Sequence, residues 1–304
     1  MATGEQSQRV ISISLGSSSR NAVAELVLAG KKFIVERLGT DGDLRKAKEL
    51  LESLDGKAAA FGLGGTDLYV CAGNERYTFR ESAELIANVH KTPVLDGSGL
   101  KNSLERKVIN ELAKTNKLVI AGTKVLLMCG VDRFGMAEAL QENGAKVTLG
   151  DLIFSLNINK PLYSLKSLGF WAKLLAPFVT RLPVSWFYPM GDEQEKRVVR
   201  HPEYFLENDI IAGDFHYIKK FMPARLPGKI IITNTVTKAD REMLREAGVK
   251  LLITTTPCLN GRSFGTNVME ALLVALDGSH KALSAEKYLE LLERYNIEAS
   301  METL

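Results

Sequence analysis

Residues 124–151 read KVLLMCGVDRFGMAEALQENGAKVTLGD. A short apolar run ends at a glycine, a stretch with apolar residues at helical spacing follows, and a second apolar run closes on Asp151. This order is typical of the β-α-β unit that opens a nucleotide-binding domain, where the helix begins directly after a glycine-containing turn. The stretch therefore predicts a Rossmann-like parallel sheet in the second part of an α/β protein.

The turn after the first strand holds two of the three glycines of the dinucleotide-binding fingerprint. Gly130 and Gly135 take the first and third positions, and Asp132 takes the second, where a coenzyme pyrophosphate approaches the backbone. A carboxylate there repels phosphate, and the neighbouring Arg133 can compensate through bidentate contact. We expect a coenzyme along this turn. The alternative is that the glycines only turn and pack an α/β layer.

Asp151 ends the second strand about 20 residues beyond the turn, where an acid accepts a hydrogen bond from the adenosine ribose. An acid at this position favours NAD over NADP, because it would repel a 2′-phosphate. Small or hydroxylated residues follow three later apolar strands, at 210–212, 230–233 and 251–254. Carboxyl ends of parallel strands form the ligand site in open α/β sheets, so we expect Thr235, Thr237 and Thr255 to face the cofactor.

The pattern of apolar residues divides the chain into four parts. Residues 1–99 combine short strands, hairpins and a helix at 43–54, which predicts a smaller N-terminal α/β domain for the substrate. An amphipathic helix at 100–118 connects it to the Rossmann-like domain, expected at 119–280. Residues 281–304 are expected to form a C-terminal helix.

The composition is that of an ordinary globular protein. Hydrophobic residues make up 45% of the 304 residues and charged residues 25%. A formal charge of +3, without a lysine- or arginine-rich block, argues against a nucleic-acid partner. The three cysteines lie far apart and form no cluster with histidine, so neither a disulfide framework nor a metal site is expected. Because the N-terminus also lacks the pattern of a signal peptide, the cytoplasm is the expected compartment.

Acidic and basic residues flank two glycine-rich turns. GLGGTD (62–67) ends an apolar strand in a turn that lets a ligand approach the backbone, and Asp67 closes it. DGSGLKNSLER (96–106) places Asp96 and Lys101 around a turn that opens a helix. A lysine desolvated in a cleft can act as a general acid or base beside a hydride transfer. The alternative is that the two aspartates cap local turns and that Lys101 is a solvated surface charge.

The loop-to-helix stretch CLNGRSFGTNVMEALL (258–273) supplies further substrate-binding candidates. It follows the last clear strand on the predicted ligand side. Arg262 suits a substrate carboxylate, and Asn267 either contacts the substrate or caps the helix. His216 also follows a strand, but a lone histidine is more often structural, and we assign it no role.

The most apolar stretch is LKSLGFWAKLLAPFVTRLPVSWFYPMG (165–191). Charged residues and prolines interrupt it, so no run approaches the ~20 apolar residues that a membrane span needs. Scattered aromatic residues with prolines indicate packing. We therefore expect the stretch to cover another domain or a partner subunit rather than to contact a membrane, which leaves homo-oligomerisation open.

Three patterns resemble the shikimate/quinate dehydrogenase family, in particular bacterial members labelled quinate 5-dehydrogenase: GLGGTDLYV (62–70), TPVLDGSGLKNSLER (92–106) and GVDRFGMAEAL (130–140). The resemblance covers most of the chain. It implies a substrate domain followed by a Rossmann-type domain for NAD or NADP. The implied reaction is hydride transfer to or from a small cyclic polyol or hydroxy acid such as quinate or shikimate.

The resemblance also implies roles for single residues. The family uses a lysine–aspartate pair for proton transfer, and the counterparts here are Lys101 with Asp67 or Asp96. Its N-terminal serines hold the substrate carboxylate, and the counterparts are Ser17 and Ser19.

Two other functions stay open. VISISLGSSSRNAVAEL (10–26) resembles the opening of acetate and butyrate kinases, which implies an ATP-dependent phosphotransferase. The other is a non-catalytic nucleotide-sensing or partner-binding protein with 165–191 as its interface. Binding of NAD(H), of ATP with Mg²⁺, or of neither would separate the three.

Overall fold

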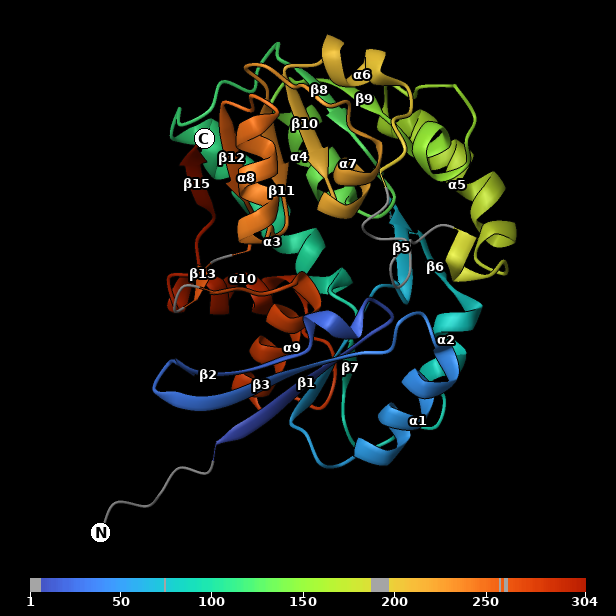
Figure 1. Ribbon diagram of the computed structural model, residues 1–304, viewed down its shortest axis with the longest axis vertical. Helices are drawn as coiled ribbons and strands as arrows, with labels where there is room; N and C mark the ends of the chain where they lie inside the picture. The colour runs from blue at the N-terminus through green and yellow to red at the C-terminus, as the bar shows by residue number, and fades with distance from the viewer. Residues whose placement is uncertain (1–6, 74, 187–196, 257, 260–261) are drawn as a thin grey trace.

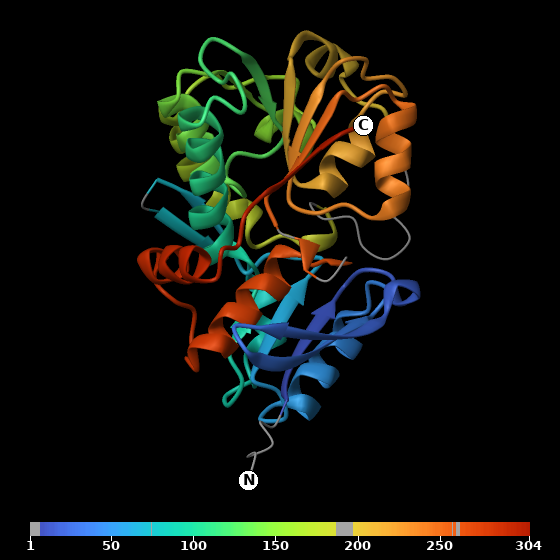
Figure 2. The same ribbon diagram turned by 90° about the vertical axis from the view of Figure 1, so that its left-hand side faces the viewer.

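Two α/β lobes make up the protein, one above the other in Figure 1. The computed structural model describes residues 7–73, 75–186, 197–256, 258–259 and 262–304, without the side chains of 258–259 and 262–263. The chain begins in the lower lobe and enters the upper lobe through α3 (Ser98–Lys114). It then returns to the lower lobe in α9 (Thr266–Asp277) before ending on the upper sheet (Figures 1 and 2).

The lower lobe is built on a five-stranded sheet with the order β2-β3-β1-β4-β7. Its strands are β1 (Gln8–Ser14), β2 (Ala22–Leu28), β3 (Lys31–Gly39), β4 (Ala60–Gly64) and β7 (Val94–Leu95). All neighbours pair in parallel except β2 and β3, which form a hairpin. The register aligns Ser12 of β1 with Arg37 of β3, so the two side chains lie on the same face of the sheet.

Helices cover both faces of this lower sheet. On one face, Ile11 and Ile13 of β1 pack with α1 (Leu44–Leu54) and α2 (Arg80–Ile86). On the other face, α9 packs on β1 and β4. Successive side chains of a strand point to opposite faces of the sheet, so β1 supplies apolar residues to both helical layers. A small hairpin of β5 (Tyr69–Ala72) and β6 (Glu75–Thr78) reaches toward the upper lobe (Figure 1).

The upper lobe is built on a six-stranded sheet with the order β15-β12-β11-β10-β8-β9. Its strands are β8 (Lys124–Leu127), β9 (Lys146–Leu149), β10 (Ile210–Gly213), β11 (Ile230–Thr233), β12 (Leu251–Thr254) and β15 (Ser300–Thr303). All pairs are parallel except β12 with β15. The prediction of a Rossmann-like parallel sheet after a smaller α/β domain is confirmed. Chain order runs outward in both directions from β8 and β10, so their carboxyl ends form the switch point where open α/β sheets bind ligands.

The remaining elements of the upper lobe are mostly helices that cover its sheet or rest on the lower lobe. They are α4 (Phe134–Glu142), η2 (Asp151–Ser155), α5 (Leu165–Val179), η3 (Val184–Trp186), α6 (Pro202–Glu207), α7 (Phe215–Phe221), α8 (Lys238–Glu246), β13 (Cys258–Leu259), β14 (Arg262–Ser263) and α10 (Ala285–Arg294). α8 begins with a capping box, in which Thr237 and Asp240 bond each other's backbone, and Gly248 (φ 84°) follows its end.

Two stretches lie elsewhere than their sequence pattern suggested. Residues 281–304 form α10 followed by a strand, β15, which pairs with β12 at the sheet edge. α9 falls within the 119–280 range expected for the nucleotide domain, but it packs on the lower sheet and on α3. The reason is that every residue from Val268 to Leu276 is buried, so this helix needs cover on several sides.

Candidate functional site

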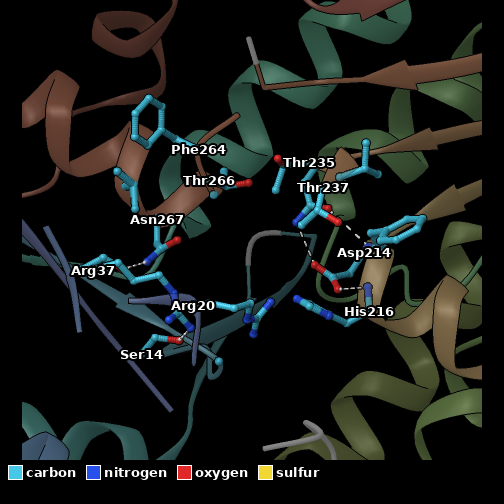
Figure 3. Close-up of a pocket in the computed structure, with 18 of the residues that line it drawn as sticks. Ser14, Arg20, Arg37, Asp214, His216, Thr235, Thr237, Phe264, Thr266 and Asn267 are labelled. Carbon is cyan, nitrogen blue, oxygen red and sulfur yellow. Dashed lines mark hydrogen bonds between the residues drawn. The ribbon is translucent and has the colours of Figure 1, made fainter. Parts of the chain in front are cut away.

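A cavity of about 820 Å³ lies between the lobes at the carboxyl ends of their strands. This volume falls within the ~300–1,000 Å³ typical of small-molecule sites. Polar residues from both lobes and from α9 line it (Figure 3): Ser12, Ser14, Arg20, Arg37, Asp67, Asp96, Lys101, Asp132, Asp214, His216, Thr235, Thr237, Thr266 and Asn267. The cavity includes the switch point of the upper sheet, so the fold itself marks it as the candidate site.

Lys101 forms the floor of this cavity and joins the two lobes. It lies in the first turn of α3, and its Nζ donates to Asp67 Oδ1 at 2.6 Å and to Asp132 Oδ1 at 2.8 Å. Asp67 follows β4 of the lower sheet, and Asp132 follows β8 of the upper sheet. The side chains of Lys101 and Asp132 are 10% exposed and that of Asp67 is 6% exposed. Lysine with two nearly buried carboxylates is a charged triad shielded from bulk water.

The members of this triad differ in proton affinity. Burial raises the pKa of Asp67 to about 7, although Lys101 opposes the rise. Burial also disfavours ionised Asp132, but Lys101 and Arg133 outweigh it and lower the pKa of Asp132 to about 2. Burial disfavours the Lys101 ammonium, yet Asp132 and Asp67 raise the pKa of Lys101 well above its ordinary value. At neutral pH, Lys101 is therefore charged, Asp132 is ionised and Asp67 is poised to gain or lose a proton.

Asp96 supports the triad without touching Lys101. Its carboxylate accepts the backbone N–H groups of Leu68 (2.6 Å), Tyr69 (3.2 Å) and Ser98 (3.0 Å). These bonds fix the chain just after Asp67 to the start of α3. Asp96 lines the cavity, but its hydrogen bonds make it a positioning residue for Asp67.

Arg133 lies inside the protein rather than at the mouth of a coenzyme site. Its side chain is 0% exposed and pairs with Glu105, with Asp214 Oδ2 at 3.0 Å and with Asp132 Oδ2 at 3.4 Å. Burial works against the charge of Arg133, but Glu105 and Asp132 raise its pKa further above its already high ordinary value. The guanidinium therefore neutralises interior carboxylates, and it is not placed to meet a pyrophosphate as the sequence pattern suggested.

The backbone amides of the turn after β8 are hydrogen-bonded within the protein. Asp151 accepts the N–H groups of Gly130 and Val131, both at 2.9 Å. These are amides of the turn along which a coenzyme was expected. Gly135 lets α4 approach α3, because a Cβ there would lie 2.2 Å from the backbone oxygen of Asn102. The glycine pattern thus reflects close packing and an internal hydrogen-bonded turn.

α5 occupies the side of this turn where the adenosine half of a dinucleotide would be expected. A Cβ on Gly130 would lie 2.9 Å from Leu168 Cδ2. Between α5, the β5–β6 hairpin and Asp151 there is an apolar cavity of only about 90 Å³. That volume is well below the ~300 Å³ at which small-molecule sites begin. In this conformation the first turn therefore does not fit a dinucleotide.

The wall opposite the upper sheet is suited to an anion. Arg37 Nη2 donates to Ser14 Oγ at 3.1 Å, and Asn267 Nδ2 donates to Ser12 Oγ at 3.2 Å. A Cβ on Gly64 would lie 3.2 Å from both Asn267 Nδ2 and Ser14 Oγ, so this glycine lets β4 pack closely against the two side chains. Burial, followed by the charge of Arg20, lowers the pKa of Arg37 to about 10, which leaves it charged at neutral pH.

The N-terminus of α9 adds hydrogen-bond donors to this wall. Its N-cap residue, Gly265, provides no side-chain cap. The hydroxyl of Thr266 is buried, has no hydrogen-bond partner among the described residues and belongs to a residue that lines the cavity. A helix N-terminus carries partial positive charge, so it and Arg37 favour the same kind of ligand.

The upper lobe contributes Asp214 and His216 at the end of β10. Asp214 accepts the N–H of His216 at 2.8 Å and the side chain of Asn234 at 2.9 Å. Burial lowers the pKa of His216, so its imidazole is neutral at pH 7. Figure 3 shows Arg20 and His216 extending into the cavity from opposite lobes.

Several predicted residues lie outside the described cavity wall. Ser17 and Ser19 bond each other at 2.8 Å, and Ser17 caps the short helix η1 (Ser18–Arg20). Thr255 is buried beneath the strand ends, where its N–H donates to Thr233 O at 2.8 Å. Arg262 lies in β14, and its side chain is outside the described residues. Thr235 and Asn267 do line the cavity.

The sequence pattern missed Arg37, Arg20, Asp214 and Thr266. The alternation in β3 held a usable signal for Arg37, because the two-residue period places this charged residue on the same face of the strand as the buried Phe33 and Val35. No sequence signal indicated Thr266, because only the return of α9 to the lower lobe brings it to the cavity.

Comparison with protein families gives two matches. The model of a domain of unknown function, DUF8754, matches residues 99–304. The chain belongs to this family. The model of a second domain of unknown function, DUF8753, matches residues 9–96, so the boundary between the models falls at the start of α3. A comparison with curated proteins found no match.

Solved structures with a similar arrangement include the malic enzyme of Entamoeba histolytica, at 11% identity and a TM-score of 0.42 over 93% of this chain. This member of the DUF8754 family spans 61% of that enzyme's chain. Another is the hetero-hexameric glutamate dehydrogenase of Thermus thermophilus, at 12% identity and a TM-score of 0.41, over 97% of this chain and 77% of that chain. These TM-scores are too low to transfer an activity, and the fold class rests on the strands and helices described above.

Proposed function

We propose that this protein is an oxidoreductase of small hydroxy acids that transfers the proton of the substrate hydroxyl through Lys101. The observation that carries the proposal is the Lys101 ammonium held between Asp67 and Asp132 on the floor of the interlobe cavity. The sequence resemblance favours a cyclic polyol acid such as quinate or shikimate.

The proton has a complete path in this arrangement. Lys101 donates a hydrogen bond to the substrate oxygen and stabilises negative charge as the hydroxyl ionises. As Lys101 takes up the hydroxyl proton, it passes one of its own to Asp67, to which it is already bonded. Asp67, with its pKa raised to about 7 by burial, can accept that proton at neutral pH and release it afterwards. Asp132 stays ionised and holds Lys101 in place.

The substrate carboxylate would bind at the opposite wall. Arg37 supplies charge, and Asn267 and Thr266 supply hydrogen-bond donors to the same cavity. An anchored carboxylate fixes the substrate at two points, which directs its hydroxyl toward Lys101. In this proposal Arg37, Asn267 and Thr266 bind the substrate carboxylate in place of Ser17 and Ser19, because the two serines bond each other.

The oxidation also requires a hydride acceptor, and NAD or NADP is the coenzyme that the sequence pattern suggests. The first turn does not fit it as it stands, because Asp151 holds the amides of Gly130 and Val131. We therefore assign no coenzyme contact to that turn. The occupied amides of this turn also favour a second function, in which the protein binds the same acids without redox chemistry.

Steady-state turnover with quinate, shikimate and simpler hydroxy acids, each with NAD⁺ and NADP⁺, tests the proposal. Lys101→Met should lower kcat by roughly 10²–10⁴-fold, the range for a lost general acid or base. Its affinity for the acid, measured by calorimetric titration, should change little. Lys114→Met, at the exposed end of the same helix, is the matched control.

Arg37→Met should show the opposite pattern, with weaker binding of the acid and a smaller effect on kcat. Acid binding without nucleotide binding or turnover would support the second function instead. Turnover that survives Lys101→Met would remove Lys101 from the mechanism.

A further inference from the structure

α5 presents an apolar stripe to solvent. Phe170, Leu174 and Phe178 follow each other at four-residue spacing and are 64%, 50% and 68% exposed. Trp186 of η3, the short helix that follows α5 in the chain, is 69% exposed as well. Large aromatic side chains in a contiguous exposed patch indicate an interaction surface. We refer to these four residues as the apolar stripe.

The stripe is not needed to hold α5 on the protein. The opposite side of the helix buries Leu168, Ala172 and Ala176. These residues line the small apolar cavity beside Asp151, which is where α5 covers the end of β9. α5 lies at the edge of the upper lobe (Figure 1), with one apolar face buried against the core and a second apolar face exposed to solvent.

In the described segment that carries the stripe, the charged residues are all basic. The chain has 36 acidic residues among 304, yet none occurs between Asp151 and Asp192. The basic residues of this interval are Lys160, Lys166, Lys173 and Arg181. Lys166 and Lys173 lie one helical turn before and one after Phe170, so they flank the stripe.

Acidic residues on the neighbouring helix α2 offset this charge only in part. Glu84 pairs with Arg80 at 2.8 Å. Glu81 accepts the N–H of Val184 at 2.8 Å and keeps its negative charge, so one acid stands against the four basic residues of the interval. The stripe and its flanking lysines thus form one cationic apolar surface.

The charge decides between the candidate occupants. A second copy of this chain, related by a two-fold axis, would bring the same lysines together, and like charges at a dry interface are destabilising. Anionic lipid headgroups complement them. A helix with Phe, Leu and Trp on one face and lysines along its edge is the pattern of an interfacial membrane helix.

In contrast to the partner subunit or domain that the sequence pattern suggested for 165–191, we infer that this face of α5 docks the protein on an anionic membrane surface, with the apolar stripe in the headgroup region and Lys166 and Lys173 contacting lipid phosphates. Among the described helices, none is long and apolar enough to span a bilayer. The contact is therefore peripheral and reversible. It does not depend on the activity proposed for the cavity.

Flotation of the purified full chain with vesicles tests the inference. Binding is expected to vesicles of phosphatidylcholine with phosphatidylglycerol, to weaken with salt, and to be much weaker to phosphatidylcholine alone. Phe170→Ser with Phe178→Ser should abolish it. The matched control is Val23→Ser with Val27→Ser, which replaces two valines of β2 that are 59% and 60% exposed.

The charge contribution has its own variant. Lys166→Glu with Lys173→Glu should weaken binding by at least roughly twentyfold, given about fivefold for each cation near the surface. Lys57→Glu with Lys117→Glu, two exposed lysines elsewhere, should have little effect.

Light scattering on the same samples separates the remaining outcomes. A monomer that binds anionic vesicles supports the inference. A dimer that dissociates in the Phe170→Ser, Phe178→Ser variant and ignores vesicles would overturn it in favour of self-association. Equal binding to neutral and anionic vesicles would overturn the role of the lysines.

Discussion

Replacing Lys101 by methionine should destabilise the protein as well as inactivate it. The substitution removes the positive partner of two carboxylates, and all three side chains are at most 10% exposed, so water screens little of the effect. Losing one partner of a buried ion pair costs about 3–5 kcal/mol. Asp132 keeps Arg133 at 3.4 Å, and Asp67 can take up a proton, so the lower end of this range applies. At pH 8 the free energy of unfolding should fall by about 3 kcal/mol, which lowers Tm by roughly 6–12 °C.

The loss should depend on pH in a definite direction. Without Lys101, the folded-state pKa of Asp67 rises further above the ordinary value of about 4. The folded variant then binds a proton that the unfolded chain releases, so its stability increases as pH falls. The difference from the unmutated protein should therefore shrink as pH falls from 8 to about 7 and then level off, because Asp67 of the unmutated protein takes up a proton there as well.

Urea unfolding of both proteins at pH 5, 6, 7 and 8 measures this difference, with circular dichroism as the probe. Lys114→Met, from the solvent-exposed end of α3, controls for the loss of a lysine. A Lys101→Met variant no less stable than this control at pH 8 would refute the buried triad. A deficit that stays constant with pH would refute the role of Asp67 as the group that takes up the proton.

Three further expectations follow from other contacts. Gly135→Ala should lower the free energy of unfolding by about 1–3 kcal/mol or more, because the new Cβ would lie 2.2 Å from Asn102 O. In the same thermal melts, the control Gly169→Ala should be neutral or stabilising, because there is open space around Gly169. Arg133→Met leaves interior carboxylates unpaired and should cost about 3–5 kcal/mol in urea unfolding, and an unaffected midpoint would count against the interior network. In the unmutated protein, the raised pKa of Asp67 should make stability decline as pH rises from about 4 to about 7, and the Asp67→Asn variant should lose that part of the slope.

Much of the architecture followed from local patterns in the chain. Val, Ile and Leu in short runs between amphipathic stretches predicted the parallel upper sheet, because strands covered on both faces carry no polar side. The helix predicted at 43–54 is α1, whose start Asp43 caps by accepting the N–H of Lys46, and Gly248 follows the end of α8 with a backbone conformation that favours glycine. These signals act over a few residues and need no tertiary information.

The coenzyme turn shows where such patterns fall short. Gly130, Gly135 and Asp151 occur at the expected spacing, but the same spacing also serves a turn that bonds its own acid and packs against two helices. α5 covers this turn, and its sequence alone gave no indication of which surface it would bury. A glycine pattern indicates that some group lies close to the backbone, and that group can be a phosphate or another part of the chain.

The sequence by itself determined the candidates Asp67, Lys101 and Asp132 as acidic and basic residues at glycine-containing turns. Only the tertiary structure made them one site, because Lys101 is 34 residues from Asp67 and 31 from Asp132 along the chain. Their pKa values depend on burial between two lobes and on one another, and neither quantity is encoded locally. The same holds for Arg37 and Thr266, which line one cavity because of strand register and because α9 returns to the lower sheet. Local backbone preferences determine strands and helices, whereas long-range packing determines which charged side chains lie next to one another.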